Sequence, residues 1–145
     1  GYTGEIDRLR ALWPGRPLLL AGMIGSNRGW VDARYVAAPA SLDALVAALG
    51  RPAEDAVIVP GVAWRHGRQA DVMRGEEVQL LGAAAAGLID PDALVCHPGT
   101  HAKWVQMEDG AIGPFRTVMT GELFAMLGRH GILQDRLSGT VGANE

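Results

Sequence analysis

Three short sets of polar residues and glycines in the chain could bind an anionic ligand, and two of them follow apolar runs. In the first set, residues 25–30 read GSNRGW and follow the apolar residues 17–24. Ser26 and Asn27 could bind the hydroxyl groups of a polyhydroxy acid, and Trp30 could form an apolar wall beside it. The alternative is a tight polar loop that contains a packed tryptophan.

The second set, residues 71–77, reads DVMRGEE and places three carboxylates and one arginine around an expected helix start. A carboxylate there could act as general base on a hydroxyl group, and Arg74 could bind a substrate carboxylate through two parallel hydrogen bonds. The alternative is a purely structural one, in which the acids stabilise the positive end of the helix dipole.

The third set, residues 98–101, reads PGTH and follows the apolar residues 94–96. A glycine lets the backbone approach a ligand closely, so that the N–H of Gly99 and the hydroxyl of Thr100 could donate to phosphate oxygens. Lys103 would add a cation. The alternative is an ordinary turn followed by a solvated lysine.

Other catalytic chemistries lack their motifs in this sequence. There is no GxxxxGK[ST] loop, no GxGxxG followed by a distant acid, and no GxSxG segment. Cys96 and His97 are neighbours on an expected strand and would point to opposite faces, and HPGTH is not the helical HExxH arrangement. We therefore expect no metal site built from protein side chains.

Composition indicates a globular protein. The 145 residues are 48% hydrophobic and 20% charged, and the net charge of -3 gives no electrostatic reason to expect nucleic acid or an anionic membrane as a partner. One cysteine cannot form an internal disulfide, which fits a reducing compartment. No apolar run reaches the roughly 18 residues of a membrane span, and no signal-peptide pattern opens the chain. We expect a soluble, cytoplasmic protein.

Short strands and helices alternate along the chain, which predicts an α/β fold with a mixed sheet. Three apolar runs are expected to be strands buried on both faces: residues 17–24, 57–59 and 94–96. Four segments are expected to be helices: residues 3–13, 42–49, 75–87 and 120–127. Thr3, Ser41 and Thr120 are the expected N-caps. Asp109-Gly110 predicts a two-residue hairpin between residues 104–107 and 112–119.

Four segments together resemble one family in their order and spacing: GMIGSNRGW, DVMRGEEVQLLGA, HPGTHAKWV and FRTVMTGELFAMLGRHGIL. They resemble the 2-dehydro-3-deoxygalactonokinases, sugar-acid kinases of the actin, Hsp70 and hexokinase superfamily, from about Leu18 to Leu133. The resemblance implies an actin-like (ribonuclease H-like) ATPase fold, with mixed sheets and flanking helices. It also implies transfer of the ATP γ-phosphoryl group, with Mg²⁺, to 2-dehydro-3-deoxy-D-galactonate, giving the 6-phosphate in galactonate breakdown. A homo-oligomer remains open.

The resemblance implies roles for the nucleotide side of the site. Gly99 and Thr100 look like the Gly-Thr turn with which this superfamily binds the ATP phosphates, and Lys103 would assist them. Related sugar kinases place a carboxylate at a helix start some twenty-odd residues before this turn. That spacing favours Glu76 as the base, then Glu77, then Asp71.

The resemblance also implies roles on the sugar-acid side. Arg74 becomes a candidate for binding the substrate carboxylate, and the loop with Ser26, Asn27 and Trp30 looks like the sugar-acid site.

Two motifs of the family do not occur in these residues: the opening Asp-x-Gly-Ser/Thr turn and the glycine-rich adenosine site. We therefore expect the chain to be the middle of a longer two-lobe kinase. Residues 1–66 would be the latter part of the first, sugar-acid-binding lobe, and residues 67–145 the start of the second, nucleotide-phosphate-binding lobe, with the boundary in the polar loop 65–71.

Two other functions compete with the kinase. One is a non-catalytic sugar-acid or nucleotide sensor with the same cleft, although the carboxylates near Arg74 favour the enzyme. The other is a metal-dependent hydrolase that uses His97 and His101.

Overall fold

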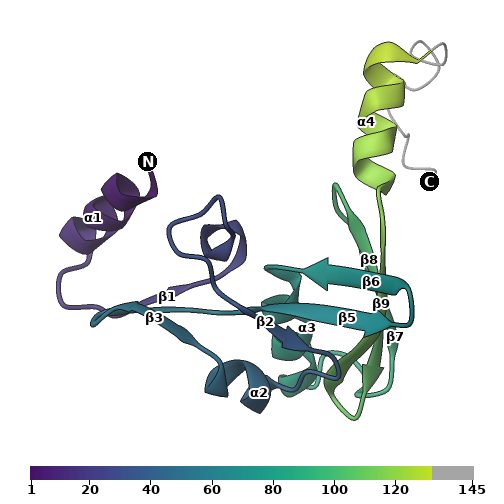
Figure 1. Ribbon diagram of the computed structural model, residues 1–145, viewed down its shortest axis with the longest axis horizontal. Helices are drawn as coiled ribbons and strands as arrows, with labels where there is room; N and C mark the ends of the chain where they lie inside the picture. Colours follow the sequence, from purple (N-terminus) through teal and green to yellow (C-terminus); the bar gives the residue numbers. More distant parts are fainter. Residues whose placement is uncertain (132–145) are drawn as a thin grey trace, which may run out of the picture.

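The computed structural model describes residues 1–131, and over these residues the fold is mixed α/β (Figure 1). The helices are α1 (Tyr2–Leu12), α2 (Leu42–Ala47), α3 (Glu76–Ala85) and α4 (Thr120–His130), with a short 3-10 helix η1 at Gly22–Gly25. The strands are β1 (Leu18–Leu20), β2 (Tyr35–Ala37), β3 (Gly50–Ala53), β4 (Ala56–Ile58), β5 (Gly61–His66), β6 (Gln69–Met73), β7 (Leu94–His97), β8 (Ala102–Glu108) and β9 (Ala111–Val118).

The described strands form three sheets of three strands each, in the orders β1-β4-β3, β2-β5-β6 and β7-β8-β9. The first two sheets each combine one parallel and one antiparallel pair, whereas the third is antiparallel throughout. The predicted α/β class with mixed sheets is confirmed.

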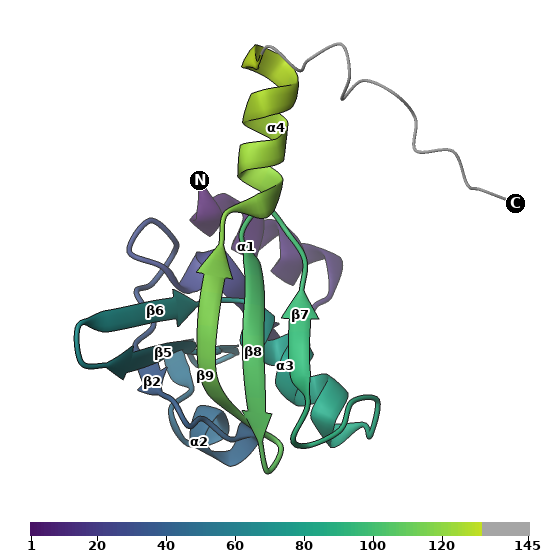
Figure 2. The same ribbon diagram turned by 90° about the vertical axis from the view of Figure 1, so that its right-hand side faces the viewer.

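The main core lies where these layers meet. Figure 2 shows β5 and β6 running crosswise to the β7-β8-β9 sheet, with α3 beside that sheet. Apolar side chains of all these layers are buried together there: Val62, Met73, Leu80, Leu81, Val105, Met107, Ile112 and Phe115. Burial of each large side chain stabilises the fold by about 1.5–3 kcal/mol. This core fixes the ends of β6, β8 and β9 relative to one another.

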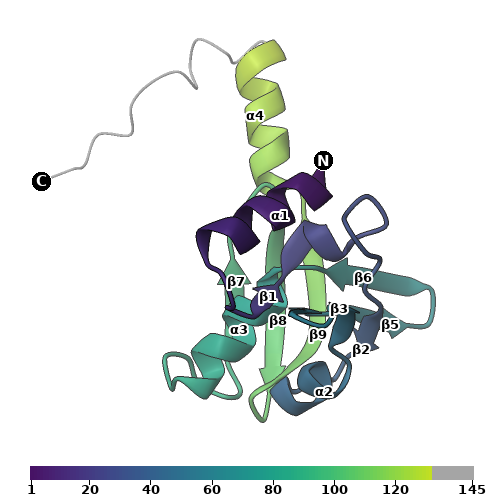
Figure 3. The ribbon, with the colours of Figure 1, turned by 90° about the vertical axis from the view of Figure 1, so that its left-hand side faces the viewer.

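Two elements lie apart from that core. Helix α1 lies near the β1-β4-β3 sheet (Figure 3). Arg10 ties the helix to this sheet by donating to both carboxylate oxygens of Asp55, at 2.8 and 2.7 Å. Helix α4 projects away from the β7-β8-β9 sheet (Figure 2). Its apolar side chains Leu123, Phe124 and Met126 are exposed.

Some predicted boundaries are confirmed and others are wrong. Ser41 caps α2 by accepting a hydrogen bond from the N–H of Ala44 at 3.2 Å, as predicted. Asp109 and Gly110 form the predicted turn between β8 and β9, with φ of 51° and 75°. Thr3 and Thr120 are not caps: each lies inside its helix, and neither helix has a side-chain cap hydrogen bond.

The predicted strand 17–24 ends at Leu20, because Gly22 has a φ of 84° and the chain turns there into η1. The prediction that the apolar strands are buried on both faces is wrong for β1 and β7. Leu19 is 68% exposed and Leu94 is 64% exposed. Both strands are edges of their sheets, and no described element covers these side chains.

The predicted loop 65–71 is instead a hairpin. Strands β5 and β6 pair from Val62 with Met73 out to His66 with Gln69, and Gly67 turns at the tip with a φ of 58°. The predicted lobe boundary at residues 66 and 67 falls at this tip. The division into two lobes stays a prediction. Residues 132–145 of the predicted second lobe lie outside the described residues, and so do residues 132 and 133, the last two covered by the family resemblance.

Candidate functional site

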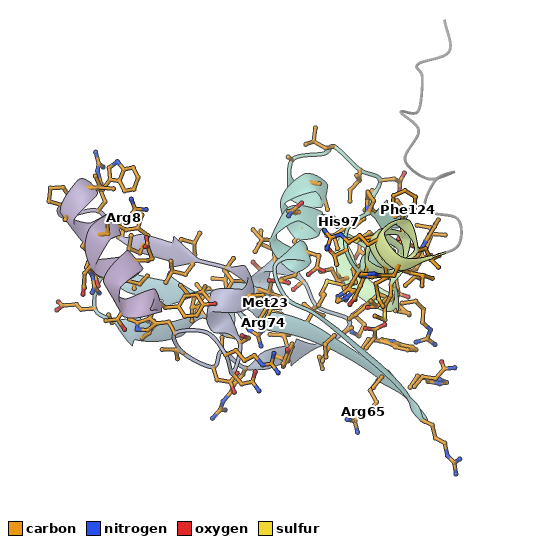
Figure 4. All side chains as sticks on the ribbon, turned by 90° about the horizontal axis from the view of Figure 1, so that it is seen from above. Arg8, Met23, Arg65, Arg74, His97 and Phe124 are labelled. Atoms are coloured by element: carbon orange, nitrogen blue, oxygen red, sulfur yellow. The ribbon has the colours of Figure 1, made fainter. Side chains whose placement is uncertain are left out.

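One hollow brings together half of the side chains that the sequence predicted separately as site residues. Its volume is about 270 Å³. Its lining contains Ser26, Asn27, Arg74, Glu76 and Lys103, completed by Met23, Tyr35, Val72, Met73 and His101. Figure 4 shows Met23 and Arg74 close together near the middle of the molecule. Groups expected to bind the sugar acid and a group expected to bind phosphate therefore share one site.

Internal hydrogen bonds fix the loop that carries Ser26 and Asn27. The Ser26 hydroxyl donates to the carbonyl of Met23 at 2.8 Å and accepts from the N–H of Arg28 at 3.2 Å. Asn27 is exposed, and its side-chain amide makes no hydrogen bond to another described residue, so it is free to bind a ligand. Trp30 is half-buried and does not line the hollow.

Arg74 is a cation without an acidic partner. Its Nη2 donates to the carbonyl of Ala33 at 2.7 Å, and its guanidinium lies 4.3 Å from the centre of the Tyr35 ring. Nε and Nη1 are buried and have no hydrogen-bond partner among residues 1–131, and no carboxylate of that part lies within 4 Å. Gly25 makes room for the group, since a Cβ there would lie 3.1 Å from Nη1. An anion beside Arg74 would compensate this charge.

Two adjacent carboxylates at the start of α3 have different environments. The Glu76 carboxylate is partly exposed and lines the hollow, and one oxygen accepts from the N–H of Arg74 at 3.0 Å. The Glu77 side chain is fully buried, and both its oxygens accept from the N–H of Gly75, at 2.8 and 2.6 Å. Burial raises the pKa of Glu77, against the opposing effect of its backbone hydrogen bonds. Of the two, only Glu76 faces the hollow.

Gly75 makes this arrangement possible. Its φ of 114° lies in the region that favours glycine, and it directs its N–H at Glu77 as the N-cap of α3. Gly22 approaches it closely, at 3.3 Å from the position that a Cβ of Gly75 would occupy.

Lys103 lines the hollow, although only 6% of its surface is exposed. Its Nζ donates to the carbonyl of Val72 at 2.7 Å and to the hydroxyl of Thr117 at 2.6 Å. Asp71, the third candidate base, does not line the hollow. Its carboxylate accepts from the hydroxyl of Thr117 at 2.7 Å and from the N–H groups of Thr117 and Val72 at 2.6 and 2.8 Å. Thr117, a residue that the sequence analysis missed, links these two charged groups.

The predicted phosphate-binding turn lies beside the hollow rather than in it. Gly99 and Thr100 are exposed between β7 and β8, and the carbonyl of Thr100 accepts from the N–H of Glu122 at 3.0 Å. Thr100 lines a second hollow, of about 320 Å³, together with residues of α4. The adjoining His101 lines the first hollow and contacts the Glu122 carboxylate at 2.6 Å.

Gly121 is a second residue that the sequence analysis missed. A Cβ there would lie 2.5 Å from the carbonyl oxygen of Gly99 and 2.9 Å from the Cα of Thr100. Only glycine lets α4 approach the Gly-Thr turn this closely.

A larger hollow, of about 640 Å³, lies beside α1, and its lining contains none of the predicted site residues. Its charged lining residues are Arg10, Arg16, Glu54 and Asp55, of which Arg10 and Asp55 form an ion pair at 2.7 Å. We place the candidate site in the smaller hollow, because five of the predicted site residues line it, among them Arg74 and Lys103, which have no carboxylate of the described residues within 4 Å. Residues 1–131 contain no group of three or more His, Cys, Asp or Glu side chains that could hold a metal ion.

No helix in the described part of the chain is long and apolar enough to cross a membrane.

Comparisons with known proteins place this arrangement in a family. Residues 5–145 match the family model described as 2-keto-3-deoxy-galactonokinase. A protein of Rhizobium meliloti (strain 1021), named Probable 2-dehydro-3-deoxygalactonokinase DgoK1, is 48% identical over 120 residues. The 2-dehydro-3-deoxygalactonokinase of Escherichia coli (strain K12) is 44% identical over 117 residues. Each match covers 81% of this chain but only 39% of the relative's length.

A solved structure is also similar. It is the crystal structure of a Sinorhizobium meliloti protein that carries the provisional name 2-dehydro-3-deoxygalactonokinase, with a TM-score of 0.80 and 43% identity. The match covers 92% of this chain and 46% of that one. The resemblance seen in the four sequence segments is thereby confirmed, and the chain belongs to the 2-keto-3-deoxy-galactonokinase family.

Proposed function

We propose that the hollow binds 2-dehydro-3-deoxy-D-galactonate, and that the chain is part of a kinase that transfers the ATP γ-phosphoryl group to the 6-hydroxyl of this sugar acid. One observation carries the proposal. Two cations without acidic partners, Arg74 and Lys103, line the same hollow as the partly exposed carboxylate of Glu76. The reaction joins an anionic acid to an anionic phosphoryl group and removes one proton, which needs two positive charges and one base.

The sugar-acid side of the site uses three groups. Arg74 binds the substrate carboxylate, because no carboxylate of the described residues lies within 4 Å of its guanidinium, which Ala33 and Tyr35 hold in place. Ser26 and Asn27 bind hydroxyl groups from a loop that its own hydrogen bonds make rigid. Trp30 belongs to the same loop but does not line the hollow.

Glu76 accepts the proton of the attacking hydroxyl. Its carboxylate faces the hollow, and the N–H of Arg74 fixes one of its oxygens at 3.0 Å. Glu77 is the second candidate and Asp71 the third, because neither lines the hollow and each has both carboxylate oxygens engaged in internal hydrogen bonds. Phosphoryl transfer depends mainly on positioning and electrostatic stabilisation, so a base held in place in this way suffices.

The nucleotide side uses the turn beside the hollow. The N–H of Gly99 and the hydroxyl of Thr100 donate to ATP phosphate oxygens, and Lys103 adds positive charge from within the hollow. Mg²⁺ bound to ATP supplies further neutralisation of the phosphates. We also propose that the complete enzyme has the actin-like two-lobe fold and acts in the cytoplasm, as the family resemblance implies.

A coupled ADP-release assay with MgATP and 2-dehydro-3-deoxygalactonate tests the function. It is run on this chain and on the full reading frame that encodes it. We expect ADP release that depends on the sugar acid in the product of the full reading frame. If neither protein releases ADP although both bind the sugar acid, the protein is a sensor and the proposal is wrong.

A further inference from the structure

We propose that Thr117 and Asp71 are positioning residues, which hold the Lys103 ammonium so that its remaining N–H group points into the hollow. The inference rests on the proposed function, in which Lys103 binds a phosphate oxygen of ATP. It concerns two residues that do not line the hollow and that act through a third.

The hydrogen-bond count leaves one donor of Lys103 free. A lysine ammonium has three N–H donors and no acceptor. Two of them are used, at 2.7 Å to the carbonyl of Val72 and at 2.6 Å to the hydroxyl of Thr117. No other described residue accepts the third. Because two of the three N–H groups are fixed by hydrogen bonds, the direction of the third N–H is fixed as well. Lys103 lines the hollow, so this N–H is the one available to a ligand there.

Asp71 determines which way the Thr117 hydroxyl points. An ionised carboxylate can only accept, so the single hydroxyl proton of Thr117 goes to Asp71 at 2.7 Å. The lone pairs of the hydroxyl are then left for the Lys103 ammonium. A second carboxylate oxygen accepts from the N–H of Thr117 at 2.6 Å and locks the same geometry. Asp71 thus orients the acceptor to which Lys103 binds.

The interposed hydroxyl also keeps Lys103 available for a ligand. No carboxylate of residues 1–131 lies within 4 Å of its Nζ, so the ammonium has no direct ion pair that an incoming phosphate would have to displace. A buried cation without such a pair is costly, and a bound anion offsets that cost. A direct Asp71–Lys103 pair would have neutralised the charge in the absence of ligand.

Two substitutions at residue 117 separate positioning from packing. Thr117→Val keeps the shape and removes the hydroxyl, whereas Thr117→Ser keeps the hydroxyl and removes the methyl group. The dissociation constant of MgATP is measured by titration calorimetry on the product of the full reading frame, with thermal unfolding of each variant. We expect Thr117→Val to raise the dissociation constant about tenfold and Thr117→Ser to leave it within about threefold. Thr3→Val, on exposed α1, is the matched control and should change nothing.

Lys103→Met separates failure of this inference from failure of the proposed function. If Lys103→Met leaves the affinity for MgATP unchanged, Lys103 does not bind ATP and both ideas are wrong. If it weakens binding while Thr117→Val does not, the positioning role alone is wrong. Equal weakening by Thr117→Val and Thr117→Ser would assign the effect to packing and would also overturn it.

If Thr117→Val does not fold, Asp71→Asn provides the test. It keeps the side-chain shape and removes the charge that orients the hydroxyl, so we expect weaker MgATP binding in the same direction, by about threefold. Unchanged binding in a folded Asp71→Asn protein would contradict the inference.

Discussion

Replacing Arg74 by methionine should separate ligand binding from folding. In the folded protein this change removes a hydrogen bond to the carbonyl of Ala33, worth about 1.5–3 kcal/mol for a charged donor. It also removes the contact with the Tyr35 ring, worth about 0.5–2 kcal/mol.

The same change removes a penalty of similar size. Nε and Nη1 are buried without partners among the described residues, and each such group costs about 1–3 kcal/mol. The gains and losses are comparable, so we expect the free energy of unfolding to change by less than about 2 kcal/mol. For a chain of this size that corresponds to a melting-temperature change below about 8 °C.

Binding of the sugar acid should respond far more strongly. Removing one partner of a desolvated charge pair costs about 2–5 kcal/mol, and each 1.4 kcal/mol is a factor of ten in affinity. We expect Arg74→Met to raise the dissociation constant of 2-dehydro-3-deoxygalactonate about 30-fold or more. Arg74→Lys keeps the charge but loses the planar group, so its effect should be intermediate.

Titration calorimetry with the sugar acid and thermal unfolding, both on the product of the full reading frame, measure the two effects. Arg65→Met is the matched control, because Arg65 is an exposed arginine that lies well away from Arg74 (Figure 4). Unchanged affinity in Arg74→Met, together with a large loss of stability, would refute the reasoning and make Arg74 a structural residue.

Three further predictions follow from the geometry. Burial raises the pKa of Glu77, so the native protein retains this proton where the unfolded chain loses it. Stability should therefore fall as the pH rises above about 4.5, until the pH passes the raised pKa of the native state. Glu77→Gln should flatten that dependence of the melting temperature, and an unchanged slope would contradict the assignment. Thr100→Ala should weaken MgATP binding in calorimetry by about two- to tenfold without affecting the sugar acid, and equal loss of both would contradict a phosphate role. Gly121→Ala should weaken MgATP binding and lower stability by about 1–3 kcal/mol, because its Cβ would meet Gly99. Gly128→Ala, with open space around its Cβ, is the control, and identical behaviour of the two variants would contradict the close approach.

The sequence correctly predicted those structural features that depend only on residues close together in the chain. The Ser41 cap of α2 depends on one side chain and the next turn of backbone. The Asp109-Gly110 turn depends on two residues that tolerate a positive φ. The burial of β1 and β7 could not be predicted in this way, because it depends on which elements cover an edge strand and not on the strand itself.

The position of Thr117 shows why part of the site escaped prediction. A regular hairpin extended from the Asp109-Gly110 turn, with Glu108 opposite Ala111, would pair Lys103 with Arg116. An irregularity between Val105 and Met107 shifts the register by one residue, so Thr117 lies opposite Lys103 instead. A shift of one residue reverses the faces on which side chains lie. The residue types at the site were visible in the sequence, but their convergence required the packing of β6 against β9.

The role of Glu76 tests the central claim most directly. Turnover is measured by coupled ADP release at saturating MgATP and 2-dehydro-3-deoxygalactonate, on the product of the full reading frame, for the wild type and for Glu76→Gln. Glu54→Gln, at an exposed glutamate outside the hollow, is the control. We predict that Glu76→Gln lowers kcat by about 100-fold or more, while the affinity for the sugar acid changes little and Glu54→Gln behaves as the wild type. Normal turnover in Glu76→Gln would contradict the account and move the base to Glu77 or Asp71.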